Sequence, residues 1–477
     1  MKHTSFYGNI MVILGLIILF PLITLFFYQE MEYLPAFLLP GLGSLGLGLA
    51  LNLLETRPER VLDDRLAFTQ DSSIKVVFTW IYGVVLGALP FVLHGDLNPI
   101  QAIFESVSGF TTTGLSVVDV SHAAKIILFH RSFMQYCGGL GFILLVSGIT
   151  TGKNSMGLYE AEGHTDRLLP NLKKTARIIF WMYNGFFLLG TVLYMVFGMP
   201  FFDSVCHAMC ALSTGGFSTK LNSLGDYESV GIRLVTVLLM VIGTTNFAVL
   251  LLLVRRKFKR AAQVSEVKFF GLLLAISIPA IAISLILQGH MSGIRAFYES
   301  LFNVTSALST TGYSTMSYTD WPEFSLGVMI VLMVIGGGIG STAGGVKLAR
   351  GCLLFKIALH NIKGQIHAKS RVDAFSYITP FGKERIGEGL IVNTTGFFLV
   401  YMGFFIVGSL LISWSAKANL TQAMFECSSS LSTVGLSIGL TNPSTDMVTL
   451  VIETVLMLLG RLEIFTFFVA LSKLVRH

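Results

Sequence analysis

The chain has 477 residues, of which 53% are hydrophobic and 13% are charged, and its formal net charge is +6. Since an ordinary soluble domain contains about 25% charged residues, this composition excludes a soluble enzyme and indicates a polytopic membrane protein. The basic residues lie between apolar segments, which is typical of membrane topology signals and not of a basic surface that binds nucleic acid.

Ten apolar segments are each long enough to cross a hydrocarbon core about 30 Å thick, which requires about 20 helical residues. Two of them come first, at residues 8–28 and 33–54. The other eight follow at residues 76–94, 126–149, 178–198, 234–254, 269–289, 324–346, 389–413 and 447–472. The sequence therefore predicts an all-α integral membrane protein with ten transmembrane helices.

A shorter, semi-polar segment lies between the two members of each successive pair of these eight spans. Each such segment contains a glycine, with a threonine two residues before it and a serine two residues after it. The glycines are Gly114, Gly216, Gly312 and Gly435, the threonines are Thr112, Thr214, Thr310 and Thr433, and the serines are Ser116, Ser218, Ser314 and Ser437. Self-similarity within one chain indicates a repeated structural unit, here a span, a short pore helix, a Thr-x-Gly loop and a second span.

This pattern divides the chain into five parts. We expect an N-terminal helical pair and linker at residues 1–74 and four pore repeats at residues 75–151, 152–260, 261–372 and 373–477. Irregular backbone at membrane depth is tolerated only where protein buries it or where it lines a water-filled cavity. Four such loops in one chain therefore predict one pseudo-fourfold pore.

The loops suit a monovalent cation. A ring of backbone carbonyls can replace the hydration shell of such an ion, and glycine allows the conformations that aim consecutive carbonyls at one axis. No charged side chain lies in residues 111–116 or in the three equivalent segments. Calcium and magnesium prefer carboxylate ligands, so the pattern favours a weakly held monovalent ion.

Two further features lie in the later spans. Residues 336–345 contain six glycines, and each glycine costs about 1 kcal/mol relative to alanine in a helix, so we expect the helix to break there. A close-packed face of small residues is the alternative, whereas the resemblance to a nucleotide-binding P-loop fails because Val346 displaces the lysine. Arg461 lies inside an apolar span, which indicates a functional or paired residue; an ion pair with Glu453, Glu463 or another helix is the structural alternative.

Acidic residues recur in the short pore helices. Asp203 and Glu299 lie thirteen residues before their glycines, and Glu105 and Glu426 lie nine residues before theirs. Two interpretations stay open: they complement the helix dipole, or they concentrate cations at the outer mouth.

The distribution of basic residues predicts the orientation. Of the 33 Lys and Arg residues, six lie on the side that carries the Thr-x-Gly loops, namely Lys125, Arg131, Lys220, Arg233, Arg295 and Lys417. Apart from Arg461, the others lie on the opposite side. The positive-inside rule then places both termini in the cytoplasm and the loop entrances outside.

The motif at residues 433–436, Thr-Val-Gly-Leu, resembles the potassium-channel signature TVGYG. With the fourfold span, pore and span pattern, residues 74–477 resemble the superfamily of Trk, Ktr and HKT cation transporters, and the N-terminal pair is most similar to that of the bacterial TrkH and TrkG proteins. The positions that match the family's filter are Thr112, Thr113, Gly114, Thr214, Gly215, Gly216, Thr310, Thr311, Gly312, Thr433, Val434 and Gly435. The second glycine of TVGYG is a serine in each repeat, which implies a wider, less selective outer end, whereas glycine at Gly114 implies potassium over sodium.

The resemblance also implies a gate. Residues 336–345 resemble the family's intramembrane loop below the filter, and Arg461 matches an arginine that projects toward the permeation path. The implied gate residues are Gly336, Gly337, Gly338, Gly340, Ser341, Thr342, Gly344, Gly345 and Arg461.

We therefore expect potassium uptake across the bacterial cytoplasmic (inner) membrane by a multi-pass protein that is no enzyme. The expected bound species is the transported K⁺ in the filter, with no organic cofactor. The resemblance implies a homodimer in the lipid bilayer and a cytosolic, TrkA-like nucleotide-binding regulatory subunit that docks on the basic cytoplasmic face. The alternative is a proton- or sodium-coupled potassium symporter. The sequence contains no constellation of nucleophile, paired acids or metal ligands that would indicate catalysis.

Overall fold

The computed structural model describes residues 5–54, 65–141, 172–366, 376–462 and 464–475. The described chain is mostly helical, because long apolar segments in a membrane satisfy their backbone hydrogen bonds internally. Large apolar side chains point outward along these helices: Leu53 is 74% exposed, Val392 69% and Trp414 73%. Outward-facing apolar surface of this kind fits a lipid environment.

The N-terminal pair consists of α1 (Phe6–Leu19), which continues as the 3₁₀ segment η1 (Phe20–Phe26), and of η2 (Met31–Tyr33) followed by α2 (Leu34–Leu54). The two helices pack closely through small residues. A β-carbon on Gly15 would lie 2.8 Å from the Gly41 carbonyl oxygen, which is the close backbone approach that small residues allow between membrane helices.

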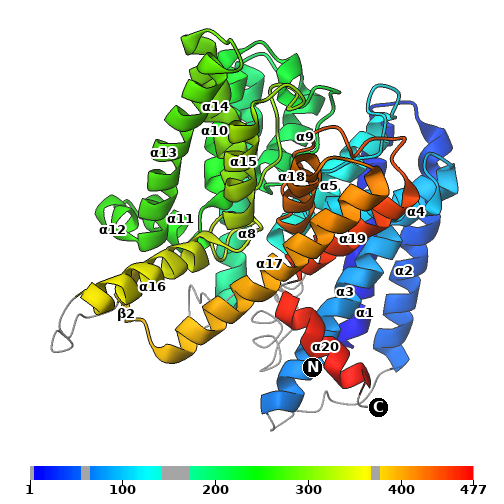
Figure 1. Ribbon diagram of the computed structural model, residues 1–477. Coiled ribbons are helices and arrows are strands. Elements are labelled where there is room, and N and C mark those ends of the chain that lie inside the picture. The colour runs from blue at the N-terminus through cyan, green and yellow to red at the C-terminus, as the bar shows by residue number, and fades with distance from the viewer. Residues whose placement is uncertain (1–4, 55–64, 142–171, 367–375, 463, 476–477) are drawn as a thin grey trace.

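Four long helices each precede a short helix and a loop. The long helices are α3 (Arg65–His94), α8 (Leu172–Val196), α13 (Ser265–Leu287) and α17 (Glu388–Ala416), and the short ones are α4 (Pro99–Phe110), α9 (Phe201–Leu212), α14 (Gly293–Leu308) and α18 (Leu420–Leu431). In α4 and α18 the N-cap asparagines, Asn98 and Asn419, form capping boxes with Gln101 and Gln422, which fixes where these helices begin. In Figure 1 the short helices lie in the upper half of the molecule, whereas α16 and α20 lie in the lower half.

The helices that follow the loops are shorter than the expected spans. They are α5 (Lys125–Leu140), α10 (Val230–Thr244) with α11 (Phe247–Val254), α15 (Glu323–Ile335), and α19 (Met447–Arg461) with α20 (Ile464–Val475). The expectation of unbroken spans at 234–254 and 447–472 was wrong, because α10 and α11 meet at 114° and α19 and α20 meet at 95°. In the span at 324–346, α15 ends at Ile335, where the expected break begins. Residues 142–149 of the span expected at 126–149 lie outside the described residues.

The α10–α11 break has a visible cause. The carbonyls of Gly243 and Thr244 accept hydrogen bonds from Thr342 and Gly338 of the 336–345 segment, so they point away from the helix ladder. Asn246 then caps α11 by accepting from the Ala248 amide at 2.7 Å. Six described helices are long and apolar enough to cross a membrane, or eight if each bent pair counts as one span. The count of ten stays a prediction.

The remaining elements are η3 (Ser223–Asp226), α12 (Phe258–Gln263), α16 (Leu348–Ile366), β1 (Ser376–Thr379) and β2 (Gly382–Arg385). The two strands form an antiparallel hairpin with Tyr377 opposite Glu384, which the sequence patterns do not predict, although the described chain is mostly helical as expected. The hairpin is anchored where the Ile378 amide donates to Ser265 Oγ at 2.9 Å, at the start of α13.

Candidate functional site

The four Thr-x-Gly loops follow the C-terminal ends of α4, α9, α14 and α18 and share one backbone conformation. The threonines Thr112, Thr214, Thr310 and Thr433 have φ values of 57°, 52°, 55° and 51°, and the glycines Gly114, Gly216, Gly312 and Gly435 have φ values of 95°, 74°, 84° and 97°. A left-handed conformation is uncommon for a β-branched residue, and strain of this kind persists only where the surroundings impose it. Because the same conformation occurs at all four predicted positions, it is a shared structural feature of the loops.

The short helices hold this conformation through their last carbonyl groups. In each loop the amide of the residue after the threonine donates to a carbonyl five residues earlier. The pairs are Thr113–Ser108 at 2.9 Å, Gly215–Cys210 at 2.8 Å, Thr311–Ser306 at 3.0 Å and Val434–Ser429 at 2.8 Å. Because these bonds use carbonyls that a helix end leaves unpaired, each loop is tied directly to its helix.

The loops meet one another around a closed circuit. A β-carbon added to Gly114 would collide with the carbonyl of Gly215, one on Gly216 with that of Thr311, one on Gly312 with that of Val434, and one on Gly435 with that of Thr113. The contacts thus run from the first loop to the second, third and fourth and back to the first. The structure brings all twelve sequence-predicted filter residues together in this arrangement, which we call the ring.

A second set of contacts supports the chain just beyond the ring. The residue nine positions before each glycine is Glu105, His207, Asn303 or Glu426, and each is buried. Glu105 accepts from Ser116 Oγ and the Val117 amide, both at 2.9 Å, and Glu426 accepts from Ser437 Oγ and, at 3.1 Å, from the Ile438 amide. His207 Nε2 lies 3.1 Å from Ser218 Oγ, and Asn303 Nδ2 donates to Thr315 Oγ1 at 2.9 Å.

The other two helix acids make similar contacts. Asp203 accepts from Thr219 Oγ1 at 2.8 Å and from the Tyr227 hydroxyl at 3.0 Å, and Glu299 accepts from Thr315 Oγ1. Asp203 and Glu299 are each 5% exposed. These carboxylates therefore position the segments that leave the ring.

Sequence reasoning gave no role to two residues of α5 that support the ring. Gln135 Nε2 donates to the Gly215 carbonyl at 2.6 Å, and its Oε1 accepts from the Phe217 amide at 3.1 Å. Arg131 forms a buried ion pair with Glu105, with 2.6 Å between Nε and Oε1, and its Nη2 donates to Ser116 Oγ at 2.6 Å. Arg131 was counted only as a topology charge; a basic and an amide residue four positions apart in an apolar helix are the signal that could have marked both.

The glycine-rich segment 336–345 lies against the threonine side of the ring. Thr342 Oγ1 lies 3.0 Å from Thr214 Oγ1, and the Gly344 amide donates to Thr310 Oγ1 at 2.8 Å. A β-carbon on Gly344 would collide with Thr433 Oγ1. The segment thus touches the threonines of three of the four loops.

The ends of this segment are fixed by backbone hydrogen bonds. Gly336, Gly340 and Gly345 have φ values of 72°, 63° and 80°, so the helix breaks where the glycine content predicts. The Gly337 amide donates to the Gly344 carbonyl at 3.2 Å, which closes the segment at its base. At its tip, the Gly340 carbonyl accepts from the Phe247 amide at 3.1 Å and the Ile339 amide donates to Glu266 Oε1 at 2.7 Å, while Ser341 Oγ donates to the Gly338 carbonyl at 2.7 Å.

Arg461 connects this segment to the first repeat. Its Nη1 donates to the Thr342 carbonyl at 2.9 Å and its Nη2 to the Gly138 carbonyl at 2.5 Å. Its guanidinium also lies 5.6 Å from the centroid of the Trp80 ring. The positive charge therefore lies beside the segment, on the threonine side of the ring.

The ring is built from neutral groups. Within the described residues, no cluster of three or more His, Cys, Asp or Glu side chains could hold a metal ion. The groups available to a cation are the backbone carbonyls and threonine hydroxyls of the loops, and oxygen dipoles of this kind suit a monovalent cation that must bind and leave.

Comparison with known proteins gives concordant matches. The family model described as TrkH, cation transport protein, matches residues 62–476. The Trk system potassium uptake protein TrkG of Escherichia coli is 30% identical over 418 residues, which cover 85% of each chain. An uncharacterized cation transporter of Methanocaldococcus jannaschii is 30% identical over 463 residues, covering 96% of this chain and 92% of the relative. The crystal structure of the potassium transporter TrkH from Vibrio parahaemolyticus superimposes with a TM-score of 0.84 at 26% identity, covering 97% of this chain and 96% of that one.

Proposed function

Because this chain belongs to the TrkH family of cation transport proteins, which are transporters and not enzymes, we propose that it mediates potassium uptake across the cytoplasmic membrane through the ring. The single observation that carries this proposal is the closed circuit of glycine-to-carbonyl contacts between the four loops. Carbonyls held at one axis can substitute for the water that a potassium ion loses on entry.

The route of the ion follows from the direction of the loops. An ion enters from the side where the short helices begin, passes the glycine carbonyls and reaches the threonine hydroxyls. The four short helices end at the ring, so their C-terminal dipoles point partial negative charge toward the ion. The sequence relationship between the loops and their similar φ values support four pore repeats within the division of the chain given above.

The segment 336–345 and Arg461 act together as the gate in this proposal. The segment lies across the exit on the threonine side, and Arg461 adds a positive charge that opposes a cation there. Conduction requires the segment to leave Thr214 and Thr310, and movement of Arg461 would release its hold on the Thr342 carbonyl.

In this proposal the gate is controlled from the cytoplasmic side. The basic elements α12 and α16 lie on the same side of the molecule in Figure 1, and α16 leads directly out of the segment. A cytosolic nucleotide-binding subunit of the TrkA type that moves α16 would move the gate. The excess of basic residues on this side supports cytoplasmic termini, and a homodimer completes the proposed assembly.

A proton- or sodium-coupled symporter is the second candidate, and one observation favours it. Glu426 and Glu453 are both buried and share Thr441, whose Oγ1 lies 3.0 Å from Glu453 Oε1 and 3.5 Å from Glu426 Oε2. Two carboxylates so close to the fourth loop could exchange a proton during transport.

Cation flux into liposomes that contain the purified chain distinguishes these functions. We expect passive uptake of potassium and rubidium, less of sodium and lithium, and no dependence on a pH gradient. Uptake that requires a proton or sodium gradient would support the symporter. Equal uptake of all four cations, or none in folded protein, would contradict the role of the ring.

A further inference from the structure

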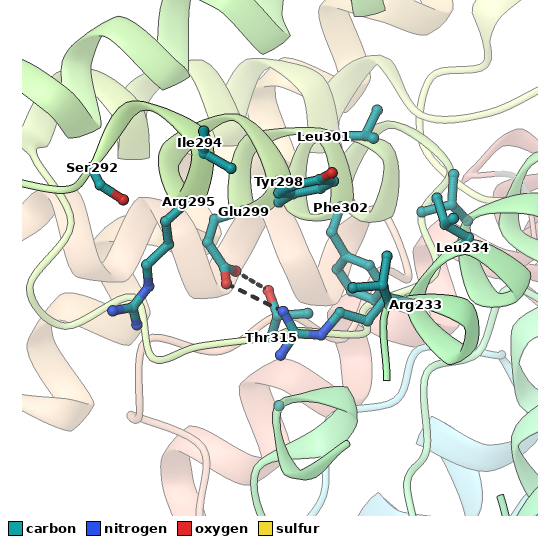
Figure 2. Close-up of a pocket in the computed structure, with 13 residues that line it drawn as sticks. Arg233, Leu234, Ser292, Ile294, Arg295, Tyr298, Glu299, Leu301, Phe302 and Thr315 are labelled. Carbon is teal, nitrogen blue, oxygen red and sulfur yellow. Dashed lines mark hydrogen bonds and ion pairs between the residues drawn. The ribbon is translucent and has the colours of Figure 1, made fainter. Parts of the chain in front are cut away.

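A groove between α10 and α14 lies on the side of the molecule where the short helices begin. Its volume is about 560 Å³, within the range of about 300–1,000 Å³ that is common for ligand sites. The groove differs from the ring in its chemistry. Its lining includes arginines and apolar side chains (Figure 2), whereas the ring presents neutral carbonyl and hydroxyl groups. The proposed transport mechanism assigns it no role.

Two arginines mark the outer end of the groove. Arg233 lies in the first turn of α10 and Arg295 in the first turn of α14. They are two of the six basic residues on this side of the chain, where the positive-inside rule disfavours them. Their presence in a single groove therefore needs a reason beyond topology.

The charges of the groove do not cancel. Arg233 Nη1 lies 3.6 Å from Glu299 Oε1, and this carboxylate also accepts from Thr315, as Figure 2 shows. The Arg233 side chain is nevertheless 29% exposed. Arg295 is exposed at the mouth of the groove. Two arginines and one glutamate leave a net charge of +1, which matches one phosphodiester.

Several apolar side chains of the lining are exposed. Leu234 is 51% exposed, Ile294 77% and Tyr298 48%. Tyrosine is enriched at the level of lipid headgroups, and exposed leucine and isoleucine side chains are suited to contact with lipid. Arginines beside apolar side chains are complementary to a lipid, which has an anionic headgroup and apolar acyl chains.

We propose that this groove binds one anionic phospholipid, with its phosphodiester beside Arg295 and the partly exposed side chain of Arg233 and its acyl chains along Leu234 and Tyr298. The occupant is a lipid and not a free anion, because the apolar side chains of the lining would make no favourable contact with a free anion. A zwitterionic lipid fits less well, since its own ammonium group would meet two arginines. This proposal does not depend on the transport mechanism, because its test measures binding.

Native mass spectrometry of the full chain in mixed micelles tests the proposal, with phosphatidylglycerol or phosphatidylcholine as the probe. We expect wild-type protein to retain one phosphatidylglycerol per chain in preference to phosphatidylcholine. Arg295→Gln should bind phosphatidylglycerol about tenfold more weakly, the effect of losing one charge-assisted hydrogen bond. The matched control is Lys417→Gln, which removes an exposed charge on the same side but outside the groove, and it should bind as wild type does.

A second variant tests the position of the acyl chains. Leu234→Trp fills the groove and leaves both arginines in place, and at an exposed position it should not prevent folding, which size-exclusion chromatography checks. We expect it to lose the bound lipid. Equal lipid retention by wild type and Arg295→Gln, an equal loss in Lys417→Gln, or full retention in Leu234→Trp would overturn the proposal. Displacement of the lipid by millimolar inorganic phosphate would also overturn it, in favour of a simple anion site.

Discussion

Single residues of the ring hold a conformation that their side chains disfavour. A left-handed backbone costs about 1–2 kcal/mol for a residue with a β-carbon, and the four threonines all adopt it. The hydrogen bonds from the next amide to the helix end offset this cost. In two of the four threonines, Thr214 and Thr310, the hydroxyl contacts the segment 336–345.

The glycines are constrained more tightly than the threonines, and Gly114→Ser tests this. A β-carbon at this position would collide with the Gly215 carbonyl, so the ring must widen. We expect the potassium-to-sodium permeability ratio to fall by about tenfold, equivalent to about 1.4 kcal/mol in relative ion stabilisation, as measured by flux into liposomes.

Gly439→Ser is the matched control for this variant. Gly439 has a φ of 97°, close to the 95° of Gly114, but no atom lies within 4 Å of its added β-carbon. The control therefore shares the backbone strain without the collision and should keep wild-type selectivity. An unchanged ratio in Gly114→Ser would refute the assignment of the ring as the filter.

The buried pair of Arg131 and Glu105 gives a prediction about stability. Arg131→Met leaves the Glu105 carboxylate, which is 0% exposed, without its charge partner. Removing one member of a buried ion pair costs about 3–5 kcal/mol, so we expect a clear fall in the unfolding temperature in detergent. The double variant with Glu105→Gln should recover part of this loss, because the uncompensated charge is gone; an equal or greater loss in the double variant would contradict the explanation.

At the scale of elements, the sequence predicted the four loops well and the helix breaks incompletely. The loops could be found because the chain repeats the same spacing of threonine, glycine and serine four times. The glycines of 336–345 correctly predicted the end of α15. The α10–α11 break was missed because residues 234–254 read as one apolar segment. Its cause is a tertiary contact: the Gly243 and Thr244 carbonyls bond to the segment 336–345, far away in sequence.

The supporting residues of the ring were missed for a related reason. Gln135 and Arg131 act across repeats or across helices, and no spacing within α5 states which backbone group they reach. His207 occupies the place that Glu105 has in the first repeat, yet its chemistry differs, so a search for identical residues does not align the two. What Glu105 and His207 share is that each contacts the serine two residues after the glycine of its own loop.

The contact between Arg461 and the segment 336–345 gives a prediction about the proposed gate. Arg461→Ala removes both the hydrogen bond to the Thr342 carbonyl and the positive charge, so we expect potassium flux into liposomes to rise several-fold. Arg461→Lys keeps the charge but cannot span both the Thr342 and Gly138 carbonyls, because a single ammonium replaces the planar guanidinium. Intermediate flux in the lysine variant would show that the positive charge and the hydrogen bond to the Thr342 carbonyl contribute separately. Flux at or below the wild-type level in the folded alanine variant would count against the proposed gate.

At the scale of the whole molecule, one chain supplies every part of the ring. The circuit of contacts returns from Gly435 to Thr113 within the same chain, and the segment 336–345 of that chain touches three of its loops. Association of two chains in the membrane would therefore place two complete rings side by side, with no residue exchanged between them. This arrangement differs from channels in which four chains build one pore at a shared axis.

A mixing experiment distinguishes one pore per chain from a pore shared between chains. Wild type is co-reconstituted with Gly312→Val, which should not conduct because its side chain would meet the Val434 carbonyl at the ring; co-purification through a tag on one chain confirms that the two associate. If each chain conducts alone, flux should fall linearly, to about half at an equal mixture, whereas a pore shared by two chains would leave about a quarter. The linear result is the one we expect, because contacts between loops of a single chain are sufficient to close the ring.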